Sequence, residues 1–209
     1  MKPTTCLWLC LLPILSAAQP MLRTNTPVTI GNTTWMAQNL NTPVFRNGDL
    51  IPEARTDEEW IQAGENQQPA WCYYANDADS GDVYGRLYNG YAVMDPRGLA
   101  PEGWRICTWK DWENFRVQYG KYAGKKLKST LHWINRSNSD NLSGFGALPG
   151  GYRHSDGLFV RRGEIGDWWT SVSLDEVQTK AAQLETHNAL IMEESMYKTY
   201  GLSVRCVKE

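Results

Sequence analysis

Histidine and cysteine are scarce in this chain, and its positive and negative charges nearly cancel. Of 209 residues only three are histidine and five are cysteine. Their spacing matches no zinc site, so the sequence indicates no metal and no cofactor. The 21 lysines and arginines against 23 aspartates and glutamates give a formal net charge of −2. A basic surface for nucleic acid is therefore not expected, and no charge run is long enough to indicate a disordered tail.

Long hydrophobic runs are also missing, with one short exception near the N-terminus. The apolar run Cys6–Leu15 precedes the small residues Ser16-Ala17-Ala18. It is shorter than the about 20 residues that span a membrane, and the pattern is typical of a signal peptide. We expect residues 1–18 to be removed by cleavage near Ala18. Residues 19–209 would then form a single exported domain, secreted or at the cell surface, with no transmembrane span.

A recognisable catalytic set is lacking as well. His132, His154 and His187 lie in separate polar stretches, and no glycine-flanked nucleophile motif is present. The acidic residues lie mostly in turn-like segments, where acids are common in any protein. We therefore predict that the protein is not an enzyme. An oxidative or hydrolytic enzyme is the alternative.

Three cysteines remain after residue 18, namely Cys72, Cys107 and Cys206. In an oxidising compartment an odd count indicates one disulfide and one free thiol, or a link between molecules. Three pairings are possible. We favour Cys107–Cys206, because both residues lie in strand-like runs near the ends of the expected core. Cys72 would then be buried and free among aromatic residues.

Tryptophan is abundant, with ten residues, nine of them after residue 18. Trp168 and Trp169 begin a strand-like run, and neighbouring residues on a strand point to opposite faces. We expect one indole to pack under the glycine-rich loops Gly144–Gly151 and the other to be at least partly exposed. The exposed ring would stack on a sugar, with hydrogen bonds from the polar neighbours Asp140, Arg153 and Asp156.

Local patterns predict two short helices and several strands. Thr56–Glu59 is a capping box that opens a helix ended by Gly64, and Thr108 with Asp111 opens a second helix that stops at Gly120. Strands are expected at Val28–Ile30, Thr33–Ala37, Trp71–Tyr74, Trp104–Ile106, Leu158–Arg162, Trp168–Ser171, Ala181–Thr186 and Leu202–Val207.

The segment Asn76–Asp82 superficially resembles a calcium loop. Acidic residues at alternate positions and a glycine would let oxygen atoms converge on a hard cation. The later bidentate glutamate and the EF-hand spacing are missing. We interpret Asp77–Asp82 as a solvated turn between strands, with calcium binding as the less favoured alternative.

Several ordered motifs carry a family resemblance. They are "VTIGNTTWMAQNLN", "YGRLYN", "YAVMDPRGLAPEGWRI", "SGFGALPGGYR", "WWTS" and "GLSVRCV". Together they resemble the Fibrobacter succinogenes major paralogous domain family over Val28–Val207. The resemblance implies a secreted or surface protein of bacteria, in a family where most members have no assigned activity. Two positions depart from the pattern, since many relatives have cysteine at Ala100 and usually proline at Cys107.

The motifs "GWRICTWKDW" and "GLSVRCV" also look distantly like the C-type-lectin-like fold of formylglycine-generating enzymes. That likeness implies an α+β fold with small, twisted, mainly antiparallel sheets, two short helices and long loops. We predict an exported, non-enzymatic binding or surface-interaction module whose partner is a glycan or a surface protein. The alternatives are a structural or assembly component of a bacterial surface array, and an enzyme distantly like the formylglycine-generating enzymes. The lectin calcium motifs are absent, so no calcium-dependent sugar site is implied.

Overall fold

The computed structural model describes residues 26–136 and 138–209, so the expected signal peptide lies outside the described residues. The helices are α1 (Asp57–Glu65), η1 (Tyr74–Asn76), α2 (Ala78–Tyr84), α3 (Gly90–Met94), α4 (Trp109–Tyr119) and α5 (Ala123–Leu127). The strands are β1 (Val28–Ile30), β2 (Thr33–Trp35), β3 (Trp71–Cys72), β4 (Leu87–Asn89), β5 (Trp104–Ile106), β6 (Tyr152–Arg153), β7 (Phe159–Val160), β8 (Ile165–Ser173), β9 (Gln178–Glu185), β10 (Met192–Tyr197), β11 (Gly201–Leu202) and β12 (Cys206–Lys208).

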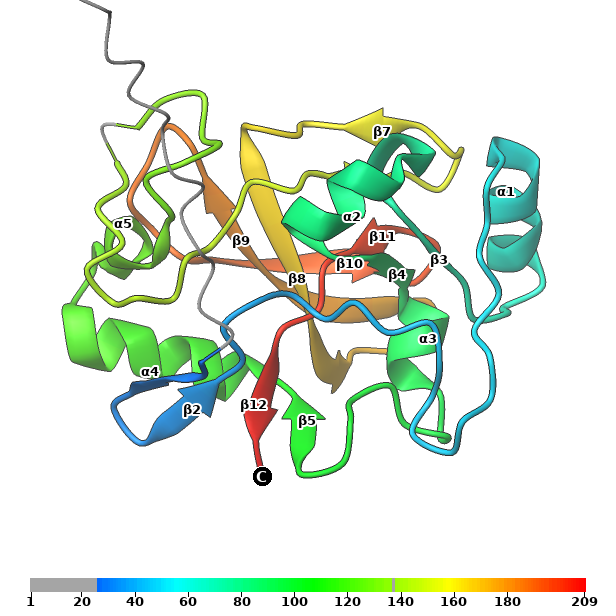
Figure 1. Ribbon diagram of the computed structural model, residues 1–209, viewed down its shortest axis with the longest axis horizontal. Coiled ribbons are helices and arrows are strands. Elements are labelled where there is room, and N and C mark those ends of the chain that lie inside the picture. Colours follow the sequence, from blue (N-terminus) through cyan, green and yellow to red (C-terminus); the bar gives the residue numbers. More distant parts are fainter. Residues whose placement is uncertain (1–25, 137) are drawn as a thin grey trace, which may run out of the picture.

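The named strands form three sheets, and every pairing between them is antiparallel. Their orders are β1-β2-β12-β5, β10-β9-β8 and β3-β4-β11-β6-β7. The C-terminal strand β12 lies between β2 and β5, so both ends of the described chain join one sheet. The long strands β8 and β9 cross the middle of the molecule (Figure 1). The predicted α+β class with mainly antiparallel sheets is confirmed.

Both predicted helices form, with the predicted N-caps. The predicted end of the first helix at Gly64 is wrong, because α1 continues to Glu65 and its C-cap is Asn66. At the start of α1 the Thr56 hydroxyl accepts from the Glu59 backbone N–H, and the Glu59 carboxylate accepts in return from the Thr56 N–H. Thr108 and Asp111 make the same reciprocal pair at the start of α4. Helix α4 ends at Gly120, whose φ of 74° is readily adopted only without a Cβ.

The expectation of only two helices is wrong, because the α-helices α2, α3 and α5 and the short 3-10 helix η1 also form within the described residues. The segment interpreted as a turn is helix α2, whose N-terminus is capped by the Asp77 side chain, 3.1 Å from the Asp79 N–H. Gly81 lets this helix press against Tyr73, since a Cβ would lie 2.2 Å from the ring. Helix α3 begins at Gly90 because Asn89 caps it through the Ala92 N–H.

The core lies on both faces of β8. One face carries Trp168, which packs with Trp112, Phe145 and their aromatic neighbours on α4 and β2. The other face carries Trp169, which packs with residues of β4, β11 and α3. We call the first group the α4 cluster and the second the β4 cluster. Strand β8 is therefore buried from both sides along most of its length.

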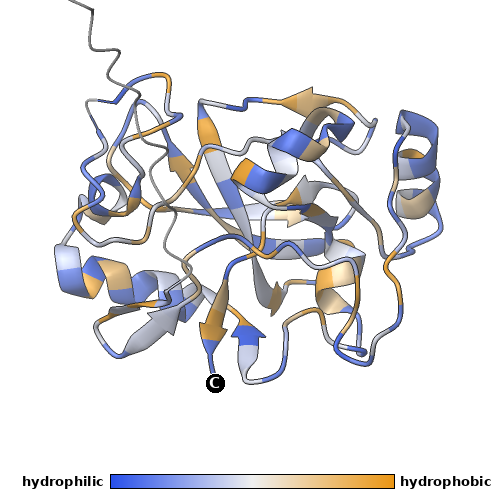
Figure 2. Ribbon diagram, in the orientation of Figure 1, coloured by the Kyte–Doolittle hydropathy of each residue, from blue (hydrophilic) through white to orange (hydrophobic). Residues whose placement is uncertain are grey.

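Helix α1 packs at the edge of the domain through a single large side chain. Figure 2 shows that α1 is largely hydrophilic, whereas the central strand β12 is largely hydrophobic. Trp60 is the buried ring of α1, and its indole N–H donates to the Thr199 carbonyl at 3.1 Å. Gly201 allows this contact, since a Cβ there would lie 2.8 Å from the Trp60 ring.

Candidate functional site

The predicted stacking residue is not at the surface. Trp168 and Trp169 are both 0% exposed. The indole N–H of Trp168 donates to the Asn39 side chain at 2.8 Å, and that of Trp169 donates to the Tyr88 carbonyl at 2.7 Å. The alternation of faces is as predicted, but the expectation that one indole is exposed is wrong. The sheet is covered on both sides, so neither ring can stack on a sugar.

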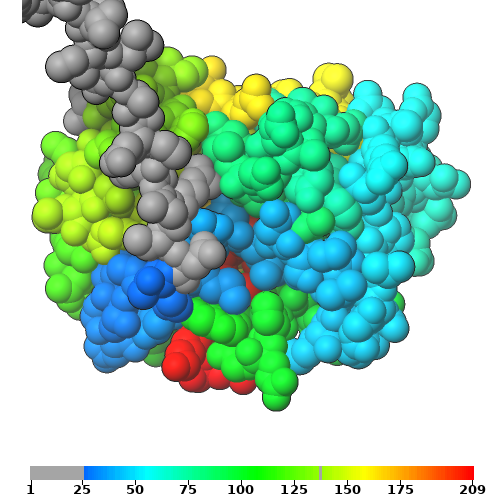
Figure 3. Space-filling model, viewed as in Figure 1, coloured from blue at the N-terminus to red at the C-terminus, as the bar shows by residue number. Residues whose placement is uncertain are grey.

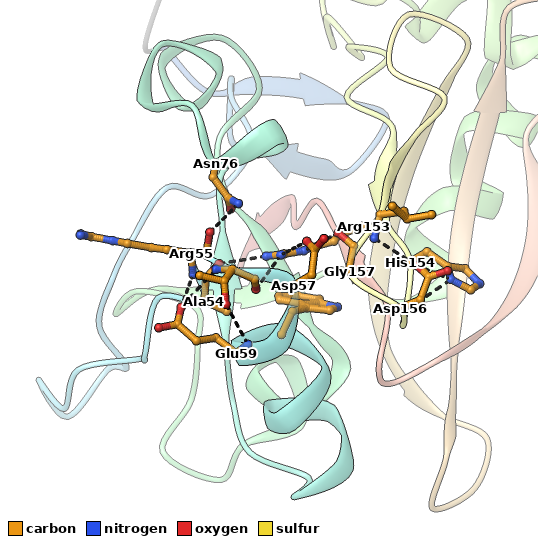
Figure 4. A network of polar contacts seen from close by, with 12 residues as sticks. Ala54, Arg55, Asp57, Glu59, Asn76, Arg153, His154, Asp156 and Gly157 are labelled. Carbon is orange, nitrogen blue, oxygen red and sulfur yellow. Dashed lines mark hydrogen bonds and ion pairs between the residues drawn. The ribbon is translucent and has the colours of Figure 1, made fainter.

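The three predicted polar neighbours do not converge on one site. Asp140 lies in a loop beside α5 and forms an ion pair with Lys126 at 2.8 Å. Arg153 and Asp156 belong instead to the hairpin of β6 and β7. Figure 4 shows them pointing apart, with Asp156 directed at His154 on the outside. The site predicted from Trp168, Trp169, Asp140, Arg153 and Asp156 is therefore not assembled.

Arg153 is a structural anchor. It is 0% exposed and donates to the carbonyls of Gly157, Ala54 and Thr56 at 2.9–3.0 Å. Arg153 also forms an ion pair with Asp57, the first residue of α1, at 3.0 Å (Figure 4). A buried guanidinium needs this full set of acceptors to offset its lost hydration. Arg153 thus ties the β6–β7 hairpin to the start of α1.

The predicted Cys107–Cys206 disulfide is not formed, and all three described cysteines are free and buried. Cys206 belongs to the β4 cluster, whereas Cys107 follows β5 and belongs to the α4 cluster. The Cys107 sulfur accepts from the Trp112 indole N–H at 3.2 Å. Burial raises the pKa of Cys72 and of Cys206 to about 12, so neither thiol is a reactive nucleophile at neutral pH.

We expect Cys72, Cys107 and Cys206 to be reduced in the folded protein, because the core holds Cys107 and Cys206 in different clusters. Iodoacetamide should label none of them in the native protein and Cys72, Cys107 and Cys206 after unfolding without reductant. Peptide mass mapping measures both results. A crosslinked peptide joining Cys107 to Cys206 would contradict the packing described here.

The alternative of a calcium site at Asp77–Asp82 finds no support in the geometry. Asp77 caps α2 through Oδ1, and its Oδ2 accepts from the Ser80 hydroxyl at 3.1 Å. Within residues 26–136 and 138–209, no group of three or more His, Cys, Asp or Glu side chains is placed to hold a metal ion. Asp77 acts on the backbone of its own helix.

A carboxylic acid lies buried on β8, an outer strand of the sheet β10-β9-β8. Asp167 on β8 is 0% exposed, and its Oδ1 accepts from the Gln183 side chain at 2.9 Å. Its Oδ2 has no hydrogen-bond partner among the described residues. Burial raises the pKa of Asp167 to about 7, assisted by the negative charges of Glu194 and Glu185. The carboxyl is enclosed by protein and is not open to a substrate.

A cavity of about 830 Å³, lined by both polar and apolar residues, forms a groove that sequence analysis did not predict. It runs between five segments, and Figure 3 shows the face where the blue N-terminal part meets the green segment of α2. The groove is lined by residues from 26–28, 37–41, 81–85, 129–132 and 141–148, and by Arg205. We call it the central groove. No local motif marks it, because its walls come from distant parts of the sequence.

The floor of the central groove is a fixed polar network. The Asn39 Oδ1 accepts from the Trp168 indole at 2.8 Å and from Arg205 Nε at 3.0 Å, and its Nδ2 donates to the Tyr84 carbonyl. Arg205 also donates to the Phe145 carbonyl at 3.0 Å. Trp168 therefore contributes to the groove from beneath, by holding Asn39, and not as a stacking surface.

The rim of the central groove carries side-chain amides and hydroxyls on irregular backbone. Gln38 and Thr130 are exposed there. His132 and Asn141 have φ values of 71° and 50°, a conformation that costs free energy in residues other than glycine. Such strained positions cluster at ligand-binding sites. The arrangement suits hydrogen bonding to a polar ligand chain, because the groove offers both donors and acceptors.

The comparisons with known proteins identify one family. Residues 28–208 match the model of the Fibrobacter succinogenes major domain, which is most of the chain. No curated protein and no solved structure matches the chain. Within the described residues, no helix has the length and apolar character needed to cross a membrane.

Proposed function

The chain belongs to the Fibrobacter succinogenes major domain family, and we propose that it acts as an exported, non-enzymatic binding module whose ligand is a glycan. The observation that carries the proposal is the central groove, with its cavity of about 830 Å³ and its fixed polar floor. Export rests on the signal-peptide pattern of residues 1–18. We also propose that the α+β arrangement is of the C-type-lectin-like type.

The chemistry of the groove favours a glycan over a protein partner. Binding sites for small molecules commonly enclose about 300–1,000 Å³, which the groove matches. Its rim offers Gln38, Asn41 and Asn141 together with the hydroxyls of Ser129 and Thr130. Amides and hydroxyls both donate and accept, as neighbouring sugar hydroxyls do. Protein interfaces instead commonly centre on buried aromatic anchors, and no Trp, Tyr or Phe among the described residues lines the groove.

Catalysis is not part of the proposal. A glycoside hydrolase of the common type needs two carboxyl groups about 5–9.5 Å apart across the sugar bond. Four acids were considered for this role, and they lie in separate places. Asp140 pairs with Lys126, Glu164 pairs with Arg161, Asp156 contacts His154, and Asp167 is buried on β8. An oxidative enzyme like the formylglycine-generating enzymes would require an accessible thiol, whereas the three described thiols are buried.

A screen of the mature protein against a glycan array and bacterial surface extracts tests the proposal. We expect binding to at least one glycan class, unchanged by a chelator, because no metal ligand is assigned to the groove. The double variant Gln38→Ala/Thr130→Ala removes two exposed rim groups and should weaken binding at least tenfold while leaving thermal stability unchanged. The matched control Gln118→Ala changes an exposed glutamine on α4 and should bind normally.

A structural role in a surface array is the second candidate, and one observation favours it. Strand β10 pairs only with β9, so the six residues Met192–Tyr197 form an open sheet edge among the described strands. Open edges accept further strands from other chains. Light scattering over a range of protein concentrations distinguishes the two roles. A monomer at all concentrations speaks for the binding module, and growth into large assemblies speaks for the array component.

A further inference from the structure

A cluster of aromatic rings reaches the surface away from the central groove. It consists of Tyr152, His154, Tyr197 and Tyr200, which we call the tyrosine platform. Tyr197 is 51% exposed, and the other three are partly exposed. None of the four lines the groove. Apolar residues scattered singly over a surface need no explanation, whereas adjoining exposed rings mark a candidate interaction site.

The rings of the platform are arranged in register by two neighbouring strands. Gly201 on β11 pairs with Arg153 on β6. At this pair the buried face of the sheet holds the Arg153 side chain, and a Cβ on Gly201 would point to the same face, toward the Trp60 ring. The flanking residues point to the opposite face because side chains alternate along a strand. The rings of Tyr152 and Tyr200 are therefore stacked against each other, at 3° and 5.7 Å between centroids. The more exposed ring of Tyr197 is tilted by 52° to that of Tyr200, at 6.1 Å between centroids. His154 lies 4.7 Å from Tyr200.

The platform is held rigidly from below. Arg153, between Tyr152 and His154 in sequence, donates its hydrogen bonds to Ala54, Thr56 and Gly157 on the inner side. The inner parts of Tyr152 and Tyr200 pack against the β4 cluster. Aromatic side chains lose little conformational entropy when a ligand binds to them, and less still when packing already fixes them.

A charged and a polar group stand at the edge of the rings. Asp156 Oδ1 lies 2.9 Å from His154 Nδ1, and the Asp156 side chain is 52% exposed. The hydrogen bond from the Leu158 backbone N–H and the contact with His154 hold the pKa of Asp156 below its usual value. Asp156 therefore accepts hydrogen bonds as a carboxylate throughout the neutral range, beside ring faces that offer apolar surface.

We infer that the tyrosine platform is a second ligand site, which stacks the C–H face of a neutral hexopyranose and holds its hydroxyls through Asp156 and His154. Pyranose rings with mostly equatorial hydroxyls have one apolar face and a polar rim, and the platform has the complementary pattern. The carboxylate of Asp156 disfavours acidic sugars by like-charge repulsion. The inference rests on the proposed function only for the ligand class, since groove and platform share no residue.

Isothermal titration of the mature protein with cellohexaose, a neutral oligosaccharide with flat ring faces, tests the inference. Tyr197→Ala should weaken binding about threefold to tenfold, the loss expected for one aromatic stacking contact. Tyr197→Phe keeps the ring and should bind within twofold of the unchanged protein. Tyr122→Ala is the matched control, because Tyr122 is a 61% exposed tyrosine elsewhere on the surface and should have no effect.

Two further ligands and the groove variant Gln38→Ala/Thr130→Ala distinguish a sugar site at the platform from a cation site there and from binding in the groove alone. Polygalacturonate, which is acidic, should bind more weakly than cellohexaose at equal chain length. Tetramethylammonium should not compete; competition would overturn the inference in favour of a site for cations. If only Gln38→Ala/Thr130→Ala weakens cellohexaose binding, the platform is not a ligand site and the groove alone is. If only Tyr197→Ala weakens cellohexaose binding, the platform is the ligand site and the proposal that the groove binds this glycan is wrong. No binding of cellohexaose at millimolar concentration overturns the inference.

Discussion

Trp168→Ala and Trp169→Ala are each expected to lower the free energy of unfolding by about 3–5 kcal/mol, the range for large buried aromatic residues. Trp168 loses contacts with Trp112 and Phe145, whose ring centroids lie 5.4 and 6.4 Å away. It also leaves Asn39 without its indole donor. Trp169 loses the hydrogen bond to the Tyr88 carbonyl, which then lies buried without that partner. Urea unfolding followed by circular dichroism measures both changes.

The partly exposed Trp104 on β5 provides the comparison for this prediction. Trp104→Ala should cost less than either buried replacement, because part of the ring already contacts water. We expect the loss of unfolding free energy to be similar for Trp168→Ala and Trp169→Ala, and smaller for Trp104→Ala. A cost below about 1 kcal/mol at Trp168 or Trp169, far under the usual range, would show that one face of β8 is open after all.

The second large effect concerns the buried carboxyl of Asp167. Its pKa is raised from 3.8 to about 7, so the folded protein holds a proton that the unfolded chain has already released between these values. Stability contributed by Asp167 is therefore complete below about pH 4 and is lost as the pH rises to about 7. Asp167→Asn removes this dependence. Its advantage over the unchanged protein should grow by about 3 kcal/mol from pH 4.5 to pH 8.

Urea unfolding at the two pH values measures this difference. Asp79→Asn is the control, because it removes one negative charge at an exposed position on α2. The charged groups that influence Asp167, namely Glu194, Glu185 and Arg161, stay in place in both variants. An equal response to pH in the Asp167→Asn variant and the unchanged protein would contradict a buried, neutral carboxyl at neutral pH.

The parts of the fold that depend on neighbouring residues could be predicted from the sequence. The caps at Thr56 and Thr108 are local, since each involves a hydroxyl and a carboxylate three residues apart. The same locality misled at Asp77, because aspartate suits a solvated turn and a helix N-cap equally well. What decides between them is Tyr73, whose ring packs against Gly81 and favours the helix.

The fate of Trp168 and Trp169 could not be predicted, because it depends on what covers the second face of β8. The period of two correctly gives opposite directions for the two rings. Whether water or protein lies on each side is decided by Trp112 on α4 and by Tyr88 on β4, which are distant in sequence. The cysteines show the same limit, since strand-like runs around Cys107 and Cys206 do not reveal that the two side chains enter different clusters.

The candidate sites could not be predicted from the sequence, because their residues also come from distant parts of the chain. Asn39 and Arg205, which form the floor of the central groove, are 166 residues apart. Asn39 lies in a motif that resembles the family, but no spacing rule gives it a role. The tyrosine platform combines residues from three elements, and only the pairing of Gly201 with Arg153 brings them together.

Hydrogen–deuterium exchange of the mature protein, with and without the glycan that binds best in the array, is the most direct test of the binding-module account. The account predicts slower exchange in the segments 37–41, 129–132 and 141–148, which line the central groove. Helix α1, on the far edge, should exchange at an unchanged rate. Failure of every glycan to bind, or protection confined to the β10 edge, would contradict the account and point to assembly with other chains.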